Sequence, residues 1–102
     1  MPSAILSPKI TDATLRVDFE RLWSDIHQTA EWGAVPDSYG MARLALSNDD
    51  KAVRNWFIAK ATKIGCEVSV DAIGNIFAIL PGINKDLAPI AMGSHLDTQF
   101  NG

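Results

Sequence analysis

A short apolar run near the end of the chain constrains the fold more than any other feature. Residues 87–92 (Leu-Ala-Pro-Ile-Ala-Met) carry no charge and show no alternation of apolar and polar side chains. Such a run is typical of a β-strand that is covered on both faces, as in the interior of a parallel or mixed sheet. Ala91 and Gly93 leave room for a helix to pack closely against it. The run therefore predicts an α/β fold, in which helices pack on a mixed sheet.

Two upstream stretches have the residue spacing of helices with one apolar face. The first covers residues 14–30, and either Thr14 or Asp18 is a suitable N-terminal cap. The second begins at Ser47, a small polar cap followed by two acidic residues, where the helix dipole favours negative charge. Gly65 follows this stretch and is the residue type that commonly ends a helix in left-handed backbone.

After the second predicted helix, the period of the apolar residues changes from 3.6 to two. Residues 66–71 alternate apolar and polar side chains, and residues 76–80 form a second short apolar run, with Gly74 or Asn75 between them. This pattern predicts a β-hairpin. Cys66 shares a face with two valines and has no basic neighbour, so we interpret it as a buried structural thiol and not as a nucleophile.

The whole-chain totals exclude several classes of partner. We expect residues 1–13 to form a flexible arm and residues 14–102 to belong to one domain. The net charge is −3, without a basic cluster, so we expect no nucleic-acid partner and no membrane partner. No window approaches the ~18 apolar residues that a membrane span requires. A single cysteine and the lack of a signal-peptide pattern favour a cytoplasmic protein.

The apolar run ends in Ser94-His95-Leu96-Asp97-Thr98, which places a metal-binding residue type at the end of a predicted strand. Residues two apart in extended backbone project to the same side, so His95 and Asp97 should face together. A histidine that ligates a metal usually donates its other N–H to a carboxylate or carbonyl, and His-x-Asp supplies such a pair. The alternative is a structural histidine that is merely capped by the neighbouring acid.

Two other polar residues have weaker claims to a function. His27 lies in the first predicted helix without nearby partners for a metal site, and we interpret it as an ordinary, partly exposed histidine. Arg43 lies among apolar residues, and one interpretation is that it pairs with a carboxylate or an anionic ligand. An ordinary surface arginine is the preferred interpretation.

Several linked motifs resemble one family of enzymes. They are Gly40–Leu44, Ser47–Ala52, Val70–Phe77, Gly93–Gln99 and the final Asn101-Gly102. In this order they closely resemble the N-terminal region of the dinuclear zinc amidohydrolases of the hydantoinase/carbamoylase group, within the zinc aminopeptidase-like superfamily. The group includes N-carbamoyl-L-amino-acid hydrolase, allantoate amidohydrolase and β-ureidopropionase. The resemblance covers residues 15 to 102, and Phe100 departs from it by standing where the family usually has proline.

This resemblance implies the N-terminal portion of a catalytic domain that hydrolyses non-peptide C–N bonds in small carboxylate-bearing substrates. It implies that His95 binds one of two divalent metals, which are zinc, manganese or cobalt, and that Asp97 orients His95. It also implies a homodimer for the complete protein. The family's remaining ligands and its general base lie further along the chain, so we expect these residues to be an N-terminal fragment that is inactive alone. The alternatives are a non-catalytic module that associates with a full-length paralogue, or a small structural α+β domain.

Overall fold

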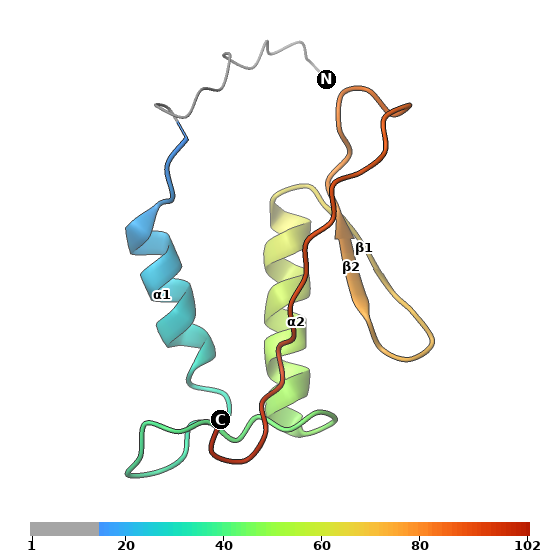
Figure 1. The fold of residues 1–102 in the computed structure, drawn as a ribbon. Helices are drawn as coiled ribbons and strands as arrows, with labels where there is room; N and C mark the ends of the chain where they lie inside the picture. Colours follow the sequence, from blue (N-terminus) through green and yellow to red (C-terminus); the bar gives the residue numbers. More distant parts are fainter. Residues whose placement is uncertain (1–14) are drawn as a thin grey trace.

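The computed structural model describes residues 15–102, in which two helices precede a β-hairpin (Figure 1). Helix α1 comprises Phe19–Thr29 and helix α2 comprises Asn48–Lys63. Strands β1 (Glu67–Val70) and β2 (Ile76–Ile79) pair in antiparallel fashion. The arm expected at residues 1–13 and the candidate cap Thr14 lie outside the described residues. The observed elements are those of an α/β fold, as the sequence predicts.

Helix α1 begins at the second of the two predicted caps. The Asp18 carboxylate accepts a hydrogen bond from the Arg21 backbone N–H at 3.0 Å, which satisfies one of the free donors at the helix start. The apolar face of α1 remains largely in solvent, because Leu22, Trp23 and Ile26 are each about half exposed. The predicted amphipathic helix is therefore present, but residues 15–102 do not cover its apolar face.

Helix α2 forms the centre of the small core. The Ser47 hydroxyl accepts from the Asp50 N–H at 3.1 Å, and the Asp50 carboxylate accepts in return from the Leu46 N–H at 3.0 Å. This reciprocal cap confirms the predicted helix start, and it explains why the Asp50 carboxylate is buried. Val53 is fully buried on this helix, which packs against both strands of the hairpin. The helix ends before Gly65, which has φ +97° as predicted.

The hairpin confirms the predicted change of period. Val68 pairs with Ala78 and Val70 with Ile76 across the two strands. Asp71 organises the turn, because its carboxylate accepts hydrogen bonds from the backbone and side-chain amides of Asn75. Cys66, at the start of the hairpin, is a free thiol that is half-buried, so its predicted burial is only partial.

The strand predicted at residues 87–92 does not form. The described chain has a two-stranded sheet only, and residues 81–93 run outside it (Figure 1). The apolar side chains of this segment are exposed. Ile90 and Met92 are each 94 % exposed. A strand of this composition needs a hydrogen-bonded neighbour and cover on both faces, and residues 15–102 provide neither. The prediction of a strand is therefore wrong for this structure, and no mixed sheet is formed within the described residues.

The C-terminal residues lie beside the loop that connects α1 to α2. After residue 80 the chain passes α2 and reaches the loop that follows α1, so that the C-terminal residues lie beside residues 33–46 (Figure 1). Met41 and Gly102 exchange two backbone hydrogen bonds of 2.9 Å each. The segment that carries His95 and Asp97 is therefore tied to the region between the two helices.

Candidate functional site

His95 and Asp97 come together as the sequence predicts. Nδ1 of His95 lies 2.7 Å from the Asp97 backbone carbonyl oxygen and 3.4 Å from Oδ1 of the Asp97 carboxylate. Because a carbonyl oxygen can only accept, the hydrogen bond places the imidazole proton on Nδ1. In the neutral imidazole, this arrangement leaves the lone pair on Nε2. The histidine side chain is 78 % exposed, so this lone pair is accessible from solvent.

The contact that orients His95 is mainly a backbone contact. We expected the Asp97 carboxylate to orient the imidazole, whereas the shorter distance is to the Asp97 carbonyl oxygen and the carboxylate is the second partner. Both groups are among those that accept the second N–H of metal-binding histidines. The pair therefore has the donor chemistry of one metal ligand and its orienting partner.

Residues 15–102 contain no complete metal site. No group of three or more His, Cys, Asp or Glu side chains gathers within residues 15–102 in a manner that could hold a metal ion. A catalytic zinc typically has three protein ligands. A metal site that included His95 would therefore need further ligands from outside residues 15–102.

Arg43 is a structural residue, and its interpretation as an ordinary surface arginine is wrong. Its guanidinium is partly buried and donates to the backbone carbonyls of three residues. Nε donates to Leu96 at 2.8 Å, and one terminal nitrogen donates to Thr29 at 2.7 Å and to Trp32 at 2.9 Å. Thr29 and Trp32 lie at and just beyond the C-terminal end of α1, where a positive charge is favourable. Arg43 thus joins the end of α1 to the segment that contains His95.

Further hydrogen bonds complete this junction, which we call the clasp and define as residues 41–43 and 96–102. Within the clasp, Thr98 exchanges two hydrogen bonds with the Arg43 main chain. The Arg43 N–H donates to the Thr98 hydroxyl at 2.8 Å, and the Thr98 N–H donates to the Arg43 carbonyl at 2.7 Å. With the Met41–Gly102 pair, these bonds hold the two segments side by side. The clasp therefore fixes the polar end of the chain without a β-strand.

Gly33 provides the space in which Arg43 lies. It is buried and has φ +98°, and a Cβ atom at this position would lie 2.7 Å from Cβ of Arg43. Only glycine combines this left-handed backbone with such a close approach. The residue pattern around Gly33 in the sequence does not indicate this role. The sequence pointers to the clasp were three motifs of the family resemblance, namely Gly40–Leu44, Gly93–Gln99 and Asn101-Gly102.

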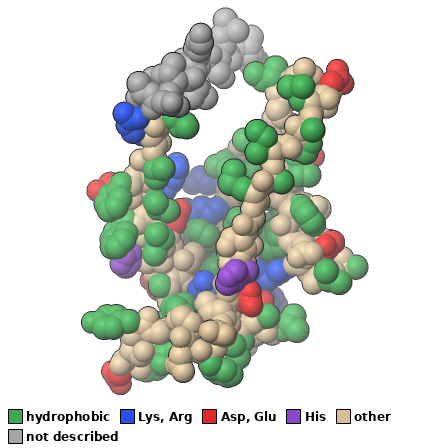
Figure 2. All heavy atoms as spheres, viewed as in Figure 1, with side chains coloured by type: hydrophobic (Ala, Val, Ile, Leu, Met, Phe, Trp, Pro, Cys, Tyr) green, Lys and Arg blue, Asp and Glu red, His purple; other side chains and the backbone are tan. Residues whose placement is uncertain are grey.

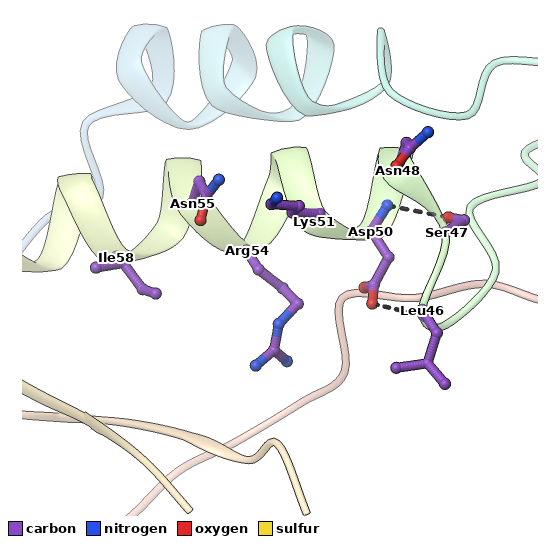
Figure 3. Close-up of a pocket in the computed structure, with 8 residues that line it drawn as sticks. All are labelled: Leu46, Ser47, Asn48, Asp50, Lys51, Arg54, Asn55 and Ile58. Atoms are coloured by element: carbon purple, nitrogen blue, oxygen red, sulfur yellow. Dashed lines mark hydrogen bonds between the residues drawn. The ribbon is translucent and has the colours of Figure 1, made fainter.

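The other candidates do not contribute to the site. His27 is exposed on α1, with Nδ1 2.9 Å from the Trp23 carbonyl oxygen and its ring packed on the Trp23 ring, as expected for an ordinary histidine. A shallow pocket beside the start of α2 contains neither His95 nor Asp97 (Figure 3). Its residues are Leu46, Ser47, Asn48, Asp50, Lys51, Arg54, Asn55 and Ile58. Asp50 in this pocket already serves the helix cap.

Within residues 15–102, no helix has the length and apolar character needed to cross a lipid bilayer.

No family model matches the chain. Comparison with known sequences identifies relatives that are named as hydrolases. N-carbamoyl-L-amino-acid amidohydrolase from Rhizobium meliloti is 34 % identical over 87 residues, which are 85 % of this chain and 21 % of the relative. The Geobacillus stearothermophilus N-carbamoyl-L-amino acid amidohydrolase is 32 % identical over 83 residues, or 81 % of this chain and 20 % of the relative. Ureidoglycolate hydrolase from Arabidopsis thaliana is 29 % identical over 85 residues, or 83 % of this chain and 18 % of the relative.

Solved structures agree with the sequence matches. A hydantoinase/carbamoylase family amidase from Burkholderia multivorans superposes with a TM-score of 0.82 at 42 % identity, over 87 % of this chain and 21 % of that protein. The corresponding amidase from Burkholderia vietnamiensis gives a TM-score of 0.83 at 41 % identity, over 90 % of this chain and 22 % of that protein. The chain thus spans about one fifth of the length of the relatives that it matches. Its relatives by sequence and by fold are therefore N-carbamoyl-L-amino-acid amidohydrolases and hydantoinase/carbamoylase family amidases, and this chain is similar to one part of them.

Proposed function

We propose that these residues belong to a metal-dependent amidohydrolase that cleaves ureido or amide C–N bonds in small carboxylate-bearing molecules, such as N-carbamoyl amino acids. The observation that carries the proposal is the geometry of His95, whose Nδ1 is anchored by Asp97 while Nε2 is free and exposed. Relatives that are named as N-carbamoyl-L-amino-acid amidohydrolases and ureidoglycolate hydrolases support the reaction class.

In this proposal His95 ligates one of two divalent metal ions through Nε2, and Asp97 keeps the imidazole in the required tautomer. When bound, the metal pair stabilises negative charge on the substrate carbonyl oxygen and makes water a nucleophile near neutral pH. Zinc is the proposed metal, with manganese and cobalt as alternatives, because imidazole suits several divalent transition metals. The remaining ligands and the general base would come from sequence beyond the present residues.

The proposal has consequences for this chain when it is alone. With one metal ligand among the described residues, it should neither bind two metal ions tightly nor hydrolyse a substrate. For the complete protein we propose a homodimer, as the family resemblance implies, and a cytoplasmic location, which the single cysteine favours.

A second candidate function is that of a non-catalytic module that associates with a full-length paralogue. The exposed apolar side chains along residues 81–93 and on α1 favour association with another protein surface (Figure 2). Purification of the chain from its own cells distinguishes the two candidates. Stoichiometric recovery of a longer paralogue would support the module, whereas recovery of a longer polypeptide that contains these residues would support the hydrolase.

A hybrid enzyme tests the proposed hydrolase. In this hybrid, residues 15–102 replace the corresponding segment of the Geobacillus stearothermophilus N-carbamoyl-L-amino acid amidohydrolase. We expect the hybrid to bind two metal ions per chain and to hydrolyse N-carbamoyl-L-amino acids, with activity that a chelator removes and zinc, manganese or cobalt restores. His95→Ala should abolish this metal-dependent activity, and His27→Ala is the matched control. Full activity in the His95→Ala hybrid would disprove the proposed role of His95.

A further inference from the structure

We propose that Arg43 is a positioning residue for the metal ligand His95, acting through the two peptide groups on either side of Asp97. The inference rests on the proposed function, since it assumes that Nε2 of His95 binds a metal. It goes beyond that function, because it assigns a task to a residue from a distant loop. Arg43 and Leu96 are 53 positions apart in the sequence.

The first link runs through the Arg43 main chain. The peptide group between Asp97 and Thr98 contains both the carbonyl that accepts from Nδ1 of His95 and the N–H that donates to the Arg43 carbonyl. These two hydrogen bonds are each 2.7 Å long. A peptide group is planar, so fixing its N–H also fixes the direction of its C=O. The Arg43 carbonyl therefore determines where the oxygen that anchors the imidazole lies.

The second link runs through the Arg43 side chain. Nε donates at 2.8 Å to the Leu96 carbonyl, which belongs to the peptide group between Leu96 and Asp97. With both flanking peptide groups held, the backbone of Asp97 has little freedom to rotate. The imidazole then leaves the backbone in one direction, and Nε2 points to one position in space.

The guanidinium itself is held rigidly. One terminal nitrogen is bound to the Thr29 and Trp32 carbonyls at the end of α1, so the side chain spans from the helix to the His95 segment. The planar guanidinium can donate in several fixed directions at once, whereas a lysine ammonium cannot reproduce this fork. The helix end thus serves as the fixed support against which the metal ligand is aligned.

Zinc affinity of the hybrid enzyme, measured by competition with a chromogenic chelator, tests this inference. Arg43→Lys retains the charge and the main-chain hydrogen bonds but cannot donate to the Leu96, Thr29 and Trp32 carbonyls at the same time. We expect it to weaken zinc binding by ~10–100-fold, as for other residues that orient metal ligands. Arg21→Lys, on an exposed part of α1, is the matched control and should leave the affinity unchanged. Ser47→Ala removes the cap of α2 away from the site, and should lower the thermal midpoint without changing zinc affinity.

These measurements distinguish a role of Arg43 in positioning His95 from a role in folding stability alone. A loss of affinity in Arg43→Lys but not in Ser47→Ala supports the inference. Unchanged affinity in Arg43→Lys, or an equal loss in Ser47→Ala, would overturn it. If Arg43→Lys does not fold, a crystal structure of the zinc-loaded unmodified hybrid decides: a guanidinium that has left the Leu96 carbonyl while His95 binds zinc would overturn the inference. If the unmodified hybrid folds but binds no zinc, the proposed function fails first, and this result is distinguishable from the others.

Discussion

Two segments near the end of the chain, residues 81–93 and residues 96–102, differ in how the rest of the molecule holds them. Residues 81–93, which include the apolar run at 87–92, are exposed, and they are not paired with any strand among the described residues. Residues 96–102 are largely polar, yet they are tied to the loop after α1 by short hydrogen bonds, with Leu96, Asp97 and Thr98 half-buried. Hydrogen-bonding groups can be satisfied by a few nearby partners, whereas an apolar strand needs a whole covering layer. The candidate site is therefore fixed while the segment leading to it remains uncovered.

The largest expected effect comes from a substitution at Gly33, which packs against Arg43 of the clasp. In the hybrid enzyme, Gly33→Ala should lower the free energy of unfolding by ~2–4 kcal/mol, because the new Cβ meets Cβ of Arg43 in strained backbone. The shift of the urea unfolding midpoint measures this loss. Gly82→Ala, where an added Cβ has no neighbour within 4 Å, is the matched control and should change stability by less than ~0.5 kcal/mol. Equal effects at the two glycines would show that the clasp is not tightly packed.

The next effect tests whether the exposed segment is covered in a complete enzyme. Ile90 is 94 % exposed here, so Ile90→Thr should leave the stability of this chain within ~0.5 kcal/mol of the original. In the hybrid, where we expect residues 87–92 to form a buried strand, the same change should cost ~2 kcal/mol, since it buries a hydroxyl and removes apolar contacts. Urea unfolding of both proteins measures the difference. An equal loss of unfolding free energy in this chain and in the hybrid would show that residues 87–92 are not buried in the hybrid.

The exposed segment should also make this chain associate with itself. Sedimentation velocity should show oligomers for the unmodified chain and fewer for the Ile90→Thr variant, because the exposed apolar surface is reduced. A monomeric profile together with cooperative thermal unfolding of the unmodified chain would contradict this expectation.

A smaller effect is expected within the clasp at Thr98. Thr98→Val keeps the shape of the side chain but removes the acceptor of the Arg43 N–H, so it should cost ~1–2 kcal/mol in the hybrid. Thr62→Val, at an exposed position on α2, serves as the control in the same urea experiment. A neutral Thr98→Val would mean that water replaces the hydroxyl without loss.

The smallest effect concerns pH and the hairpin turn. The side-chain amide of Asn75, followed by its backbone N–H, holds the pKa of the Asp71 carboxyl below its usual value. A lowered pKa in the folded state means that this stabilisation is present above the ordinary Asp pKa and is lost as the pH falls through the lower, folded value. Hydrogen exchange at the Asn75 amide, corrected for its intrinsic pH dependence, should show protection falling in that acidic range. Asp71→Asn should remove this pH step, and a persistent step would assign it to another group.

Local features of the fold were predictable from the sequence because their causes lie within a few residues. The Ser47 cap, the stop at Gly65 and the hairpin each depend on neighbours in the sequence. The same holds for His95 and Asp97, whose proximity follows from their spacing. Arg43 was misjudged because its partners are distant in sequence, and nothing in its own neighbourhood identifies them. The strand at residues 87–92 was overpredicted because apolar composition shows a need for cover and not its presence.

By itself, the sequence determined the identity and order of the helices and hairpin strands, the pairing of His95 with Asp97, and the resemblance to the family. These properties depend on local backbone preferences and on spacing along the chain. Only the tertiary structure decided that Arg43 and Gly33 support the site, that the Asp97 backbone carbonyl is the nearer partner of His95, and that residues 81–93 remain uncovered. The physical reason is that hydrogen bonds and burial between distant segments depend on the path of the whole chain, which residue type and spacing do not specify.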